Sequence, residues 1–221
     1  MDFFVFYIGC CIGSFCNLVS YRLIKNEDWI FKRSYSECCN KELQLIYVLP
    51  IFSYLFLKGK CPFCHQKISI RHLFLELVSG LGIYLLYLYS NYFFIETLII
   101  MILFIISLMD LQLMEFNGEL LFILAFLMFV YKITTSNHTS LFLLFICLFL
   151  KNKLGDGDFW IIILMSFCLD YRQWLLFIYI SVFLGTIYSL YLIITKKQSL
   201  KNCIPFCPFL SIGVFFAFMF G

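Results

Sequence analysis

The chain has 221 residues, of which 63% are hydrophobic and 13% charged, with a formal net charge of +3 and a mean hydropathy of +0.96. Soluble globular domains are about half apolar and about one quarter charged, so this composition excludes them and indicates a protein that crosses a membrane several times. Residues 1–8 lack the basic start and the cleavage site of a secretory signal peptide, and we expect the first apolar segment to be retained.

Eight apolar segments follow one another along the chain, and crossing the hydrocarbon core takes about 20 helical residues. They lie at residues 3–21, 73–90, 92–109, 118–133, 139–152, 155–171, 173–194 and 204–221. The fifth and sixth are short and could instead form a re-entrant pair. To cross, the sixth must also use the polar residues that precede its apolar part. The sequence therefore predicts an all-α polytopic membrane protein with about eight transmembrane helices.

The Lys and Arg residues set the predicted orientation. With the N-terminus outside, all of them except Lys132 and Arg172 lie in cytoplasmic loops, as the positive-inside rule requires. The domains expected are a first transmembrane helix at 1–23, a cytoplasmic cysteine-bearing loop at 24–72, and a seven-helix membrane region at 73–221. Most of the positive charge is therefore expected at the cytoplasmic face.

Two aspartates are expected at one depth just below that face. Asp110 closes the third segment and Asp158 opens the sixth. Placing an ionisable residue at membrane depth costs free energy, so such a residue indicates a functional site. Gly155 and Gly157 flank Asp156 and let the backbone bend or approach a neighbour. Two carboxylates in a partly dry site divide their roles, one holding a proton while the other activates water, which is how aspartic proteases hydrolyse amides.

Other readings of these aspartates stay open from spacing alone. They could be interfacial residues, helix caps or partners of Lys151 and Lys153, or the proton relay of a transporter. The sequence has no Gly-x-Ser-x-Gly or His-Glu-x-x-His motif and no phosphate-binding glycine loop.

A series of short motifs carries a family resemblance. They are Asn17 and residues 13–15, 21–23, 49–51, 53–55, 58–61, 68–71, 76–77, 155–158, 204–206 and 208–210. In this order they resemble the bacterial type IV prepilin peptidases, along nearly the whole chain.

The resemblance implies an intramembrane aspartic protease of the GxGD type in the bacterial inner membrane, which removes the basic leader of prepilins or pseudopilins for type IV pili, secretion or competence. Asp158 is then the GxGD aspartate and Asp110 its partner. Asp156 fills a variable position between the two glycines, and Glu76 matches a family carboxylate to which the residues themselves assign no role. Such enzymes often also methylate the new N-terminus with S-adenosylmethionine. The partners expected are the pilin substrate and lipid, with no nucleic acid.

Two departures from the family pattern favour a rival, a degenerate relative that binds pilins as a non-catalytic scaffold. Residues 115–118 replace the usual Ile-Pro pair, and Trp160 replaces a common lysine.

The loop at 24–72 holds four cysteines: Cys38, Cys39, Cys61 and Cys64. Paired Cys-x-x-Cys knuckles typically bind a structural zinc ion through four thiolates. Here Ser36 stands at the first cysteine of the family pattern, and neighbouring side chains of an extended segment point apart, so Cys38 could be the fourth ligand only if the knuckle bends. Zinc binding and metal-free packing both stay open.

Overall fold

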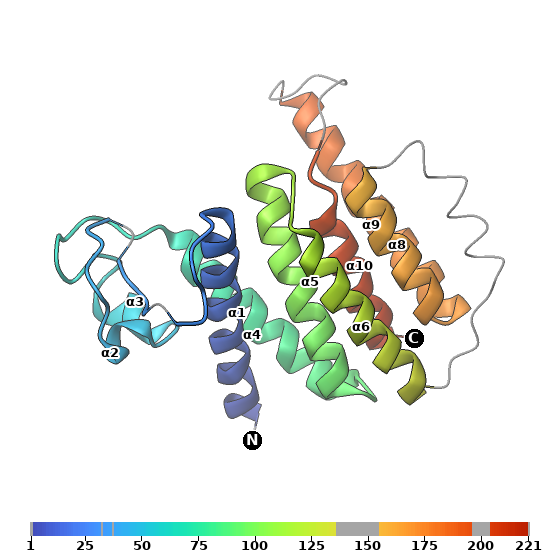
Figure 1. Cartoon of the computed structure of the whole chain (residues 1–221), viewed down its shortest axis with the longest axis horizontal. Helices are drawn as coiled ribbons and strands as arrows, with labels where there is room; N and C mark the ends of the chain where they lie inside the picture. The colour runs from blue at the N-terminus through green and yellow to red at the C-terminus, as the bar shows by residue number, and fades with distance from the viewer. Residues whose placement is uncertain (1, 32, 37, 136–154, 196–203, 221) are drawn as a thin grey trace. The chain divides into compact units, whose positions relative to one another are not determined.

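The computed structural model describes residues 2–31, 33–36, 38–135, 155–195 and 204–220. Within these ranges the protein is helical and contains no strand, only two isolated β-bridges, which confirms the all-α class (Figure 1). The helices are α1 (Asp2–Ile24), α2 (Leu45–Val48), α3 (Phe52–Phe56), α4 (Ile70–Tyr89), α5 (Phe93–Leu113), α6 (Gly118–Thr135), α8 (Asp156–Cys168), α9 (Tyr171–Ile194) and α10 (Cys207–Phe220).

Five of these helices, α1, α4, α5, α6 and α9, are long and apolar enough to cross a membrane, so a multi-pass membrane protein is confirmed. Their bounds lie within a few residues of the predicted segments. The predicted segment 139–152 lies outside the described residues. Helices α8 and α10 have 13 and 14 residues, hence lengths of about 20 Å, against about 30 Å of hydrocarbon. The number of eight spans therefore remains a prediction, as do the domain bounds.

The chain divides into two compact units, Met1–Leu88 and Tyr89–Gly221. In the first unit, α1 and α4 approach through glycines. A Cβ atom on Gly9 would lie 2.8 Å from Cα of Gly80, and one on Gly13 would collide with Ser79. Gly9 and Gly13 are four residues apart and share one helix face, the small-xxx-small spacing that lets membrane helices touch backbone to backbone.

In the second unit, α10 contacts α5, α8 and α9, while α6 contacts α5 and α8. The core of this unit comes from fully buried side chains, among them Ile99, Leu103, Ile161, Phe177 and Leu210. Helix α10 begins at Cys207, directly before Pro208, and proline is tolerated only in the first turn of a helix. The start of α10 is thus fixed by sequence and lies within the packed core.

Candidate functional site

Asp110 and Asp158 come from different helices and bind the same residue, Cys207. The backbone N–H of Cys207 donates to Oδ2 of Asp110 at 3.1 Å, and its thiol donates to Oδ1 of Asp158 at 3.2 Å. Asp110 is 7% exposed and Asp158 is half-buried. The two predicted catalytic residues, 48 positions apart by their numbers, are therefore brought together in the second unit.

Helix ends place both carboxylates. Asp110 lies in the last turn of α5, where its carbonyl accepts the N–H of Met114, a residue in the left-handed conformation that ends the helix. Asp158 lies in the first turn of α8, which is capped by Gly155 in an extended conformation. Helix α8 thus includes the polar residues before its apolar part, as predicted.

The two motif glycines have different surroundings. A Cβ atom on Gly157 would lie 2.5 Å from Cζ of Phe116, whereas one on Gly155 would meet only Oδ2 of Asp158, at an ordinary 3.5 Å. The missing side chain of Gly157 therefore lets the ring of Phe116 approach the backbone closely, whereas no group lies that close to Gly155. Asp156, between them, is exposed.

Glu76 lies in the first unit, on α4. Its Oε2 accepts the backbone N–H of Ile51 at 2.8 Å. Ile51 has φ 64° and ψ −56°, a strained γ-turn conformation closed by the bond from the N–H of Phe52 to the carbonyl of Pro50, and it precedes the short helix α3. Glu76 thus holds a strained loop position.

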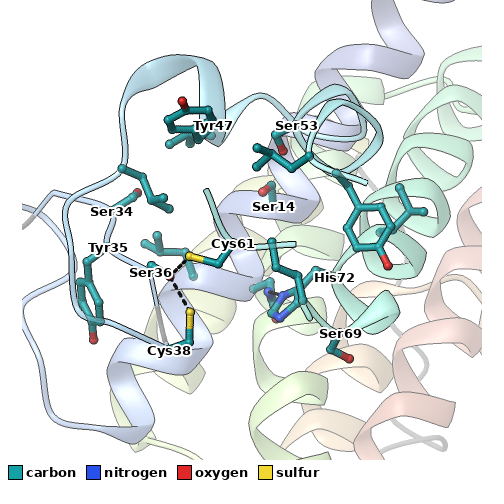
Figure 2. A pocket seen from close by; sticks show the side chains of 18 of the residues that line it. Ser14, Ser34, Tyr35, Ser36, Cys38, Tyr47, Ser53, Cys61, Ser69 and His72 are labelled. Carbon is teal, nitrogen blue, oxygen red and sulfur yellow. Dashed lines mark hydrogen bonds between the residues drawn. The ribbon is translucent and has the colours of Figure 1, made fainter. Parts of the chain in front are cut away.

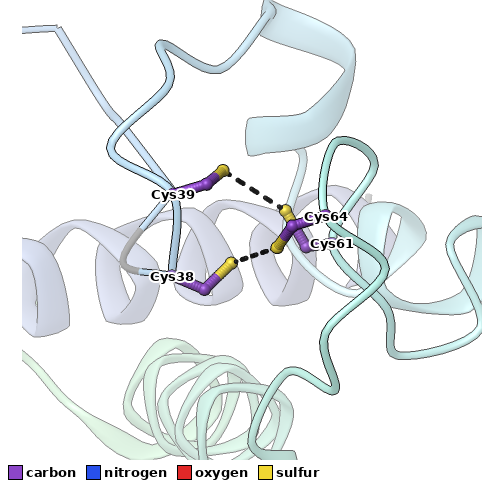
Figure 3. A group of neighbouring side chains, drawn as sticks. All are labelled: Cys38, Cys39, Cys61 and Cys64. Atoms are coloured by element: carbon purple, nitrogen blue, oxygen red, sulfur yellow. Dashed lines mark hydrogen bonds between the residues drawn. The ribbon is translucent and has the colours of Figure 1, made fainter.

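The four loop cysteines form one cluster, with all four sulfur atoms within 4.8 Å of one another (Figure 3). The Sγ of Cys38 lies 2.9 Å from that of Cys64, and the Sγ of Cys39 lies 3.9 Å from that of Cys61. Cys38 and Cys39 lie in a turn rather than in an extended segment, so the bend that a fourth ligand requires is present. Four sulfurs at this separation can hold a tetrahedral zinc ion.

The two cysteine turns have the same backbone pattern. In the first, the N–H of Ser36 bonds the carbonyl of Lys41 and Asn40 has a positive φ; in the second, the N–H of Cys61 bonds the carbonyl of Gln66 and His65 has a positive φ. An antiparallel bridge brackets each turn, Tyr35 with Glu42 and Lys60 with Lys67. Ser36 is therefore the structural counterpart of Cys61.

Ser36 also contacts the cluster. Its hydroxyl lies 3.1 Å from Sγ of Cys38 and 3.2 Å from Sγ of Cys61. Burial raises the pKa of the Cys61 thiol, but hydrogen bonds from Ser36 and from the N–H groups of Cys64 and Phe63 lower that pKa to about 5. The hydrogen bond with Cys38 instead raises the pKa of Cys64 to about 12. Of Cys61 and Cys64, Cys61 thus becomes a thiolate more readily, and the thiolate is the form that binds metal.

A pocket of about 510 Å³ opens beside this cluster, within the first unit (Figure 2). Tyr21, Tyr35, Tyr47 and Tyr54 line it, together with the carboxylate of Glu76. Asn17 and His72, hydrogen-bonded to each other at 2.9 Å, form another part of the wall. Its volume lies in the range of small-molecule sites, about 300–1,000 Å³.

Known proteins resemble both the first unit and the whole chain. Residues 7–90 match the family described as the bacterial peptidase A24 N-terminal domain. A prepilin leader peptidase/N-methyltransferase of Bacillus subtilis (strain 168) is 26% identical over 237 residues, which cover 98% of this chain and 93% of the relative. The chain is similar to bacterial prepilin leader peptidase/N-methyltransferases along nearly its whole length. The resemblance expected from the motifs is confirmed.

Further prepilin leader peptidase/N-methyltransferases match over different extents. One of Pseudomonas putida is 24% identical across 97% of this chain and 88% of its own length. One of Vibrio cholerae is 36% identical over 78 residues, which are 32% of this chain and 31% of the relative. No solved structure matches the chain.

The two departures from the family pattern lie on segments that adjoin the aspartates in the sequence. Phe116, from the unusual stretch at 115–118, packs on Gly157, and Trp160 is 54% exposed on α8. Neither side chain replaces an aspartate, so both carboxylates of the pair are retained.

Cys207 is the site residue that sequence reasoning missed. It stands between two motifs of the family resemblance, 204–206 and 208–210, and belongs to neither. Its position directly before a proline at the start of the last helix was the available signal, since the first N–H groups of a helix have no partner inside it.

Proposed function

We propose that this protein is an intramembrane aspartic endopeptidase that removes the leader peptide of type IV prepilins or pseudopilins at the cytoplasmic face of the inner membrane. The observation that carries the proposal is the joint binding of Asp110 and Asp158 by Cys207. The names of the relatives supply the substrate class. Two carboxylates from separate helices at one buried point match the needs of acid–base amide hydrolysis.

The reaction needs one charged and one protonated carboxylate. The charged group takes a proton from water as the water oxygen bonds to the scissile carbonyl carbon. The protonated group gives its proton to the amide nitrogen as the carbon–nitrogen bond breaks. Water supplies the oxygen and the two hydrogens that the products gain, and the proton taken by the first carboxylate returns to the second before the next turnover, so this chemistry requires no further reactant.

The predicted orientation fits such a substrate. A prepilin has a basic leader, which stays in the cytoplasm for the same reason that the Lys and Arg residues of this chain do. Its apolar helix would enter the second unit from the lipid, so that the junction between leader and helix meets the aspartates.

Co-expression with the prepilin encoded in the same organism tests the proposal. We expect Asp110→Asn and Asp158→Asn each to abolish the mature product, because each removes one of the two proton carriers. Glu119→Gln changes an exposed carboxylate in the first turn of α6 and serves as the matched control. Mature pilin that persists in either Asn variant would refute the aspartate pair.

The rival proposal, a scaffold that binds pilins without cutting them, predicts a different result. The unchanged chain would then co-purify with full-length prepilin and yield no mature product. The departures at 115–118 and Trp160 motivate this alternative.

We also propose that the pocket in the first unit binds S-adenosylmethionine, which when bound supplies a methyl group for the new N-terminal amine. The fit rests on the pocket's chemistry. Tyrosine rings suit a flat base and a sulfonium cation, and the Glu76 carboxylate suits an ammonium group. The second activity in the relatives' names motivates the choice of ligand.

Calorimetry of the purified protein with S-adenosylmethionine tests this second activity. Tyr47→Ala should weaken binding about tenfold through the loss of one stacking or cation–π contact. Tyr179→Ala, which removes an exposed tyrosine of α9, should bind as the parent does. Equal affinity in the two variants would argue against the pocket, and mass spectrometry of the mature pilin N-terminus would show whether a methyl group is added.

For the cysteine cluster we propose a structural zinc ion held by Cys38, Cys39, Cys61 and Cys64. It would tie the two turns together, and the carboxylates of the second unit leave it no part in hydrolysis.

A further inference from the structure

Cys207 has an arrangement that the proposed reaction does not by itself explain. It is 2% exposed and opens α10. Among the described residues it is the one hydrogen-bonded to both aspartates: its backbone N–H donates to Asp110, and its thiol donates to Asp158 and also interacts with Asp110. One residue therefore fixes the position of both carboxylates.

We propose that Cys207 is a positioning residue of the peptidase, holding Asp110 and Asp158 together and giving them unequal partners. This inference rests on the proposed function and deepens it. It assigns the charged, water-activating role to Asp110 and the proton-donating role to Asp158.

The inequality follows from the two donors. The N–H that reaches Asp110 is the first of α10, where the helix carries a partial positive charge that favours an anion. The donor to Asp158 is a thiol, which forms weak hydrogen bonds. The negative charge is therefore better stabilised on Asp110, and Asp158 keeps the proton.

Cys207 is itself held firmly. The hydroxyl of Ser107, on α5, contacts the carbonyl oxygen of Cys207 at 3.3 Å and Oγ of Ser211 at 3.0 Å. Leu210 and Val214, one and two turns further along α10, are fully buried. The start of α10 is thus tied to the helix that carries Asp110, and a rigid element of this kind can set the geometry of a site.

Steady-state cleavage of a prepilin by purified protein, measured across pH, tests the inference. Cys207→Ala removes the thiol and keeps the N–H. We expect kcat to fall about tenfold with KM unchanged, from the loss of one hydrogen bond to a carboxylate.

The pH profile gives a readout that a purely structural role would not move. A carboxylate that loses a donor holds its proton more tightly, so Asp158 would remain a proton donor to higher pH. The alkaline limb of kcat should therefore move upward, and by more than the acidic limb, which reports Asp110 and keeps the backbone N–H donor of Cys207. Cys207→Ser, which keeps a donor, should restore most of the rate and the original limb.

Cys168→Ala is the matched control. Cys168 is also buried in the second unit and also donates through its thiol at 3.2 Å, but to the carbonyl of Met128 rather than to a carboxylate. Its pH profile should equal that of the parent.

The outcomes separate the two proposals. Cleavage that survives Asp158→Asn would refute the proposed function. If Asp158→Asn abolishes cleavage but the pH profile of Cys207→Ala equals that of Cys168→Ala, only the role of Cys207 is overturned. If Cys207→Ala shifts the acidic limb instead of the alkaline limb, the assignment of the acid and base roles is overturned. If Cys207→Ala does not fold, Cys207→Gly decides the question by the same profile.

Discussion

The ring of Phe116 lies against the backbone of Gly157, so that a Cβ atom there would be 2.5 Å from Cζ of the ring. Phe116 belongs to the stretch between α5 and α6, and Gly157 to the first turn of α8. This contact joins the segment that follows Asp110 to the turn that carries Asp158.

We therefore expect Gly157→Ala to reduce prepilin cleavage about tenfold or more, because the methyl group must displace the ring or the first turn of α8, and overpacking costs about 1–3 kcal/mol. Gly155→Ala should cleave at nearly the parent rate, since its methyl group meets only an ordinary contact. The measurement is the initial rate of mature pilin formation at equal amounts of folded enzyme.

Phe116→Ala provides the internal check on that explanation. Combined with Gly157→Ala it should recover much of the lost rate, because the obstructing ring is gone. A double variant as slow as Gly157→Ala alone would mean that the glycine is needed for another reason.

The equivalence of Ser36 and Cys61 gives a prediction for the metal site. Cys38→Ser should release zinc from the purified protein, because it removes one of four sulfur ligands. In the background of Ser36→Cys the same change should leave zinc bound, since position 36 occupies the place that Cys61 has in the other turn.

Metal analysis by mass spectrometry checks this prediction, with Cys168→Ser as a control thiol outside the loop. Zinc content equal in the parent and in Cys38→Ser would argue for metal-free cysteines, or for a ligand set that excludes Cys38.

The bond between Glu76 and Ile51 predicts a local defect. Glu76→Ala leaves the N–H of Ile51 without its acceptor, and the γ-turn conformation with positive φ costs a β-branched residue about 1–3 kcal/mol. We expect residues 45–57 to become sensitive to limited proteolysis, whereas Glu76→Gln, which keeps an oxygen acceptor, should protect them.

Ile51→Gly, which relieves the conformation, should restore much of the protection when combined with Glu76→Ala. Unchanged protection in Glu76→Ala itself would show that the loop is held by other contacts.

The crossing of α1 and α4 predicts a loss of stability. Gly9→Ala places a methyl group 2.8 Å from backbone Cα of Gly80, which cannot rotate away. We expect a lower melting temperature in detergent, with a cost of about 1–3 kcal/mol.

Gly118→Ala is the control, because a Cβ atom there meets nothing within 4 Å. It should leave the melting temperature unchanged or raise it slightly, as alanine favours a helix more than glycine does. Equal melting temperatures for Gly9→Ala and the parent would contradict the close crossing.

Composition and hydropathy sufficed to predict the helices that are apolar throughout, such as α5 and α9, because lipid imposes a length on such segments. The same reasoning placed α8 and α10 within three residues of their observed bounds, although their first residues are set by a glycine cap and by Pro208 rather than by lipid. Hydropathy ended the third apolar segment at residue 109, directly before Asp110, whereas helix α5 continues through Asp110 to Leu113.

The candidate site was predictable where residue type carries the chemistry. Asp110 and Asp158 follow from the rarity of carboxylates in apolar sequence, and the four cysteines from their spacing. The contacts made by Cys207 and Phe116 depend on which helices pack together, and no local pattern contains that information.

The shortness of α8 has a consequence for the surrounding lipid. With the predicted orientation, this helix begins at the cytoplasmic side and falls about 10 Å short of the hydrocarbon thickness. Such hydrophobic mismatch is relieved by local thinning of the bilayer, which draws headgroups and their hydration inward around the helix. Hydrolysis in vesicles should then depend on acyl-chain length, being fastest in lipids thin enough to let bulk water reach the carboxylates without further deformation of the membrane.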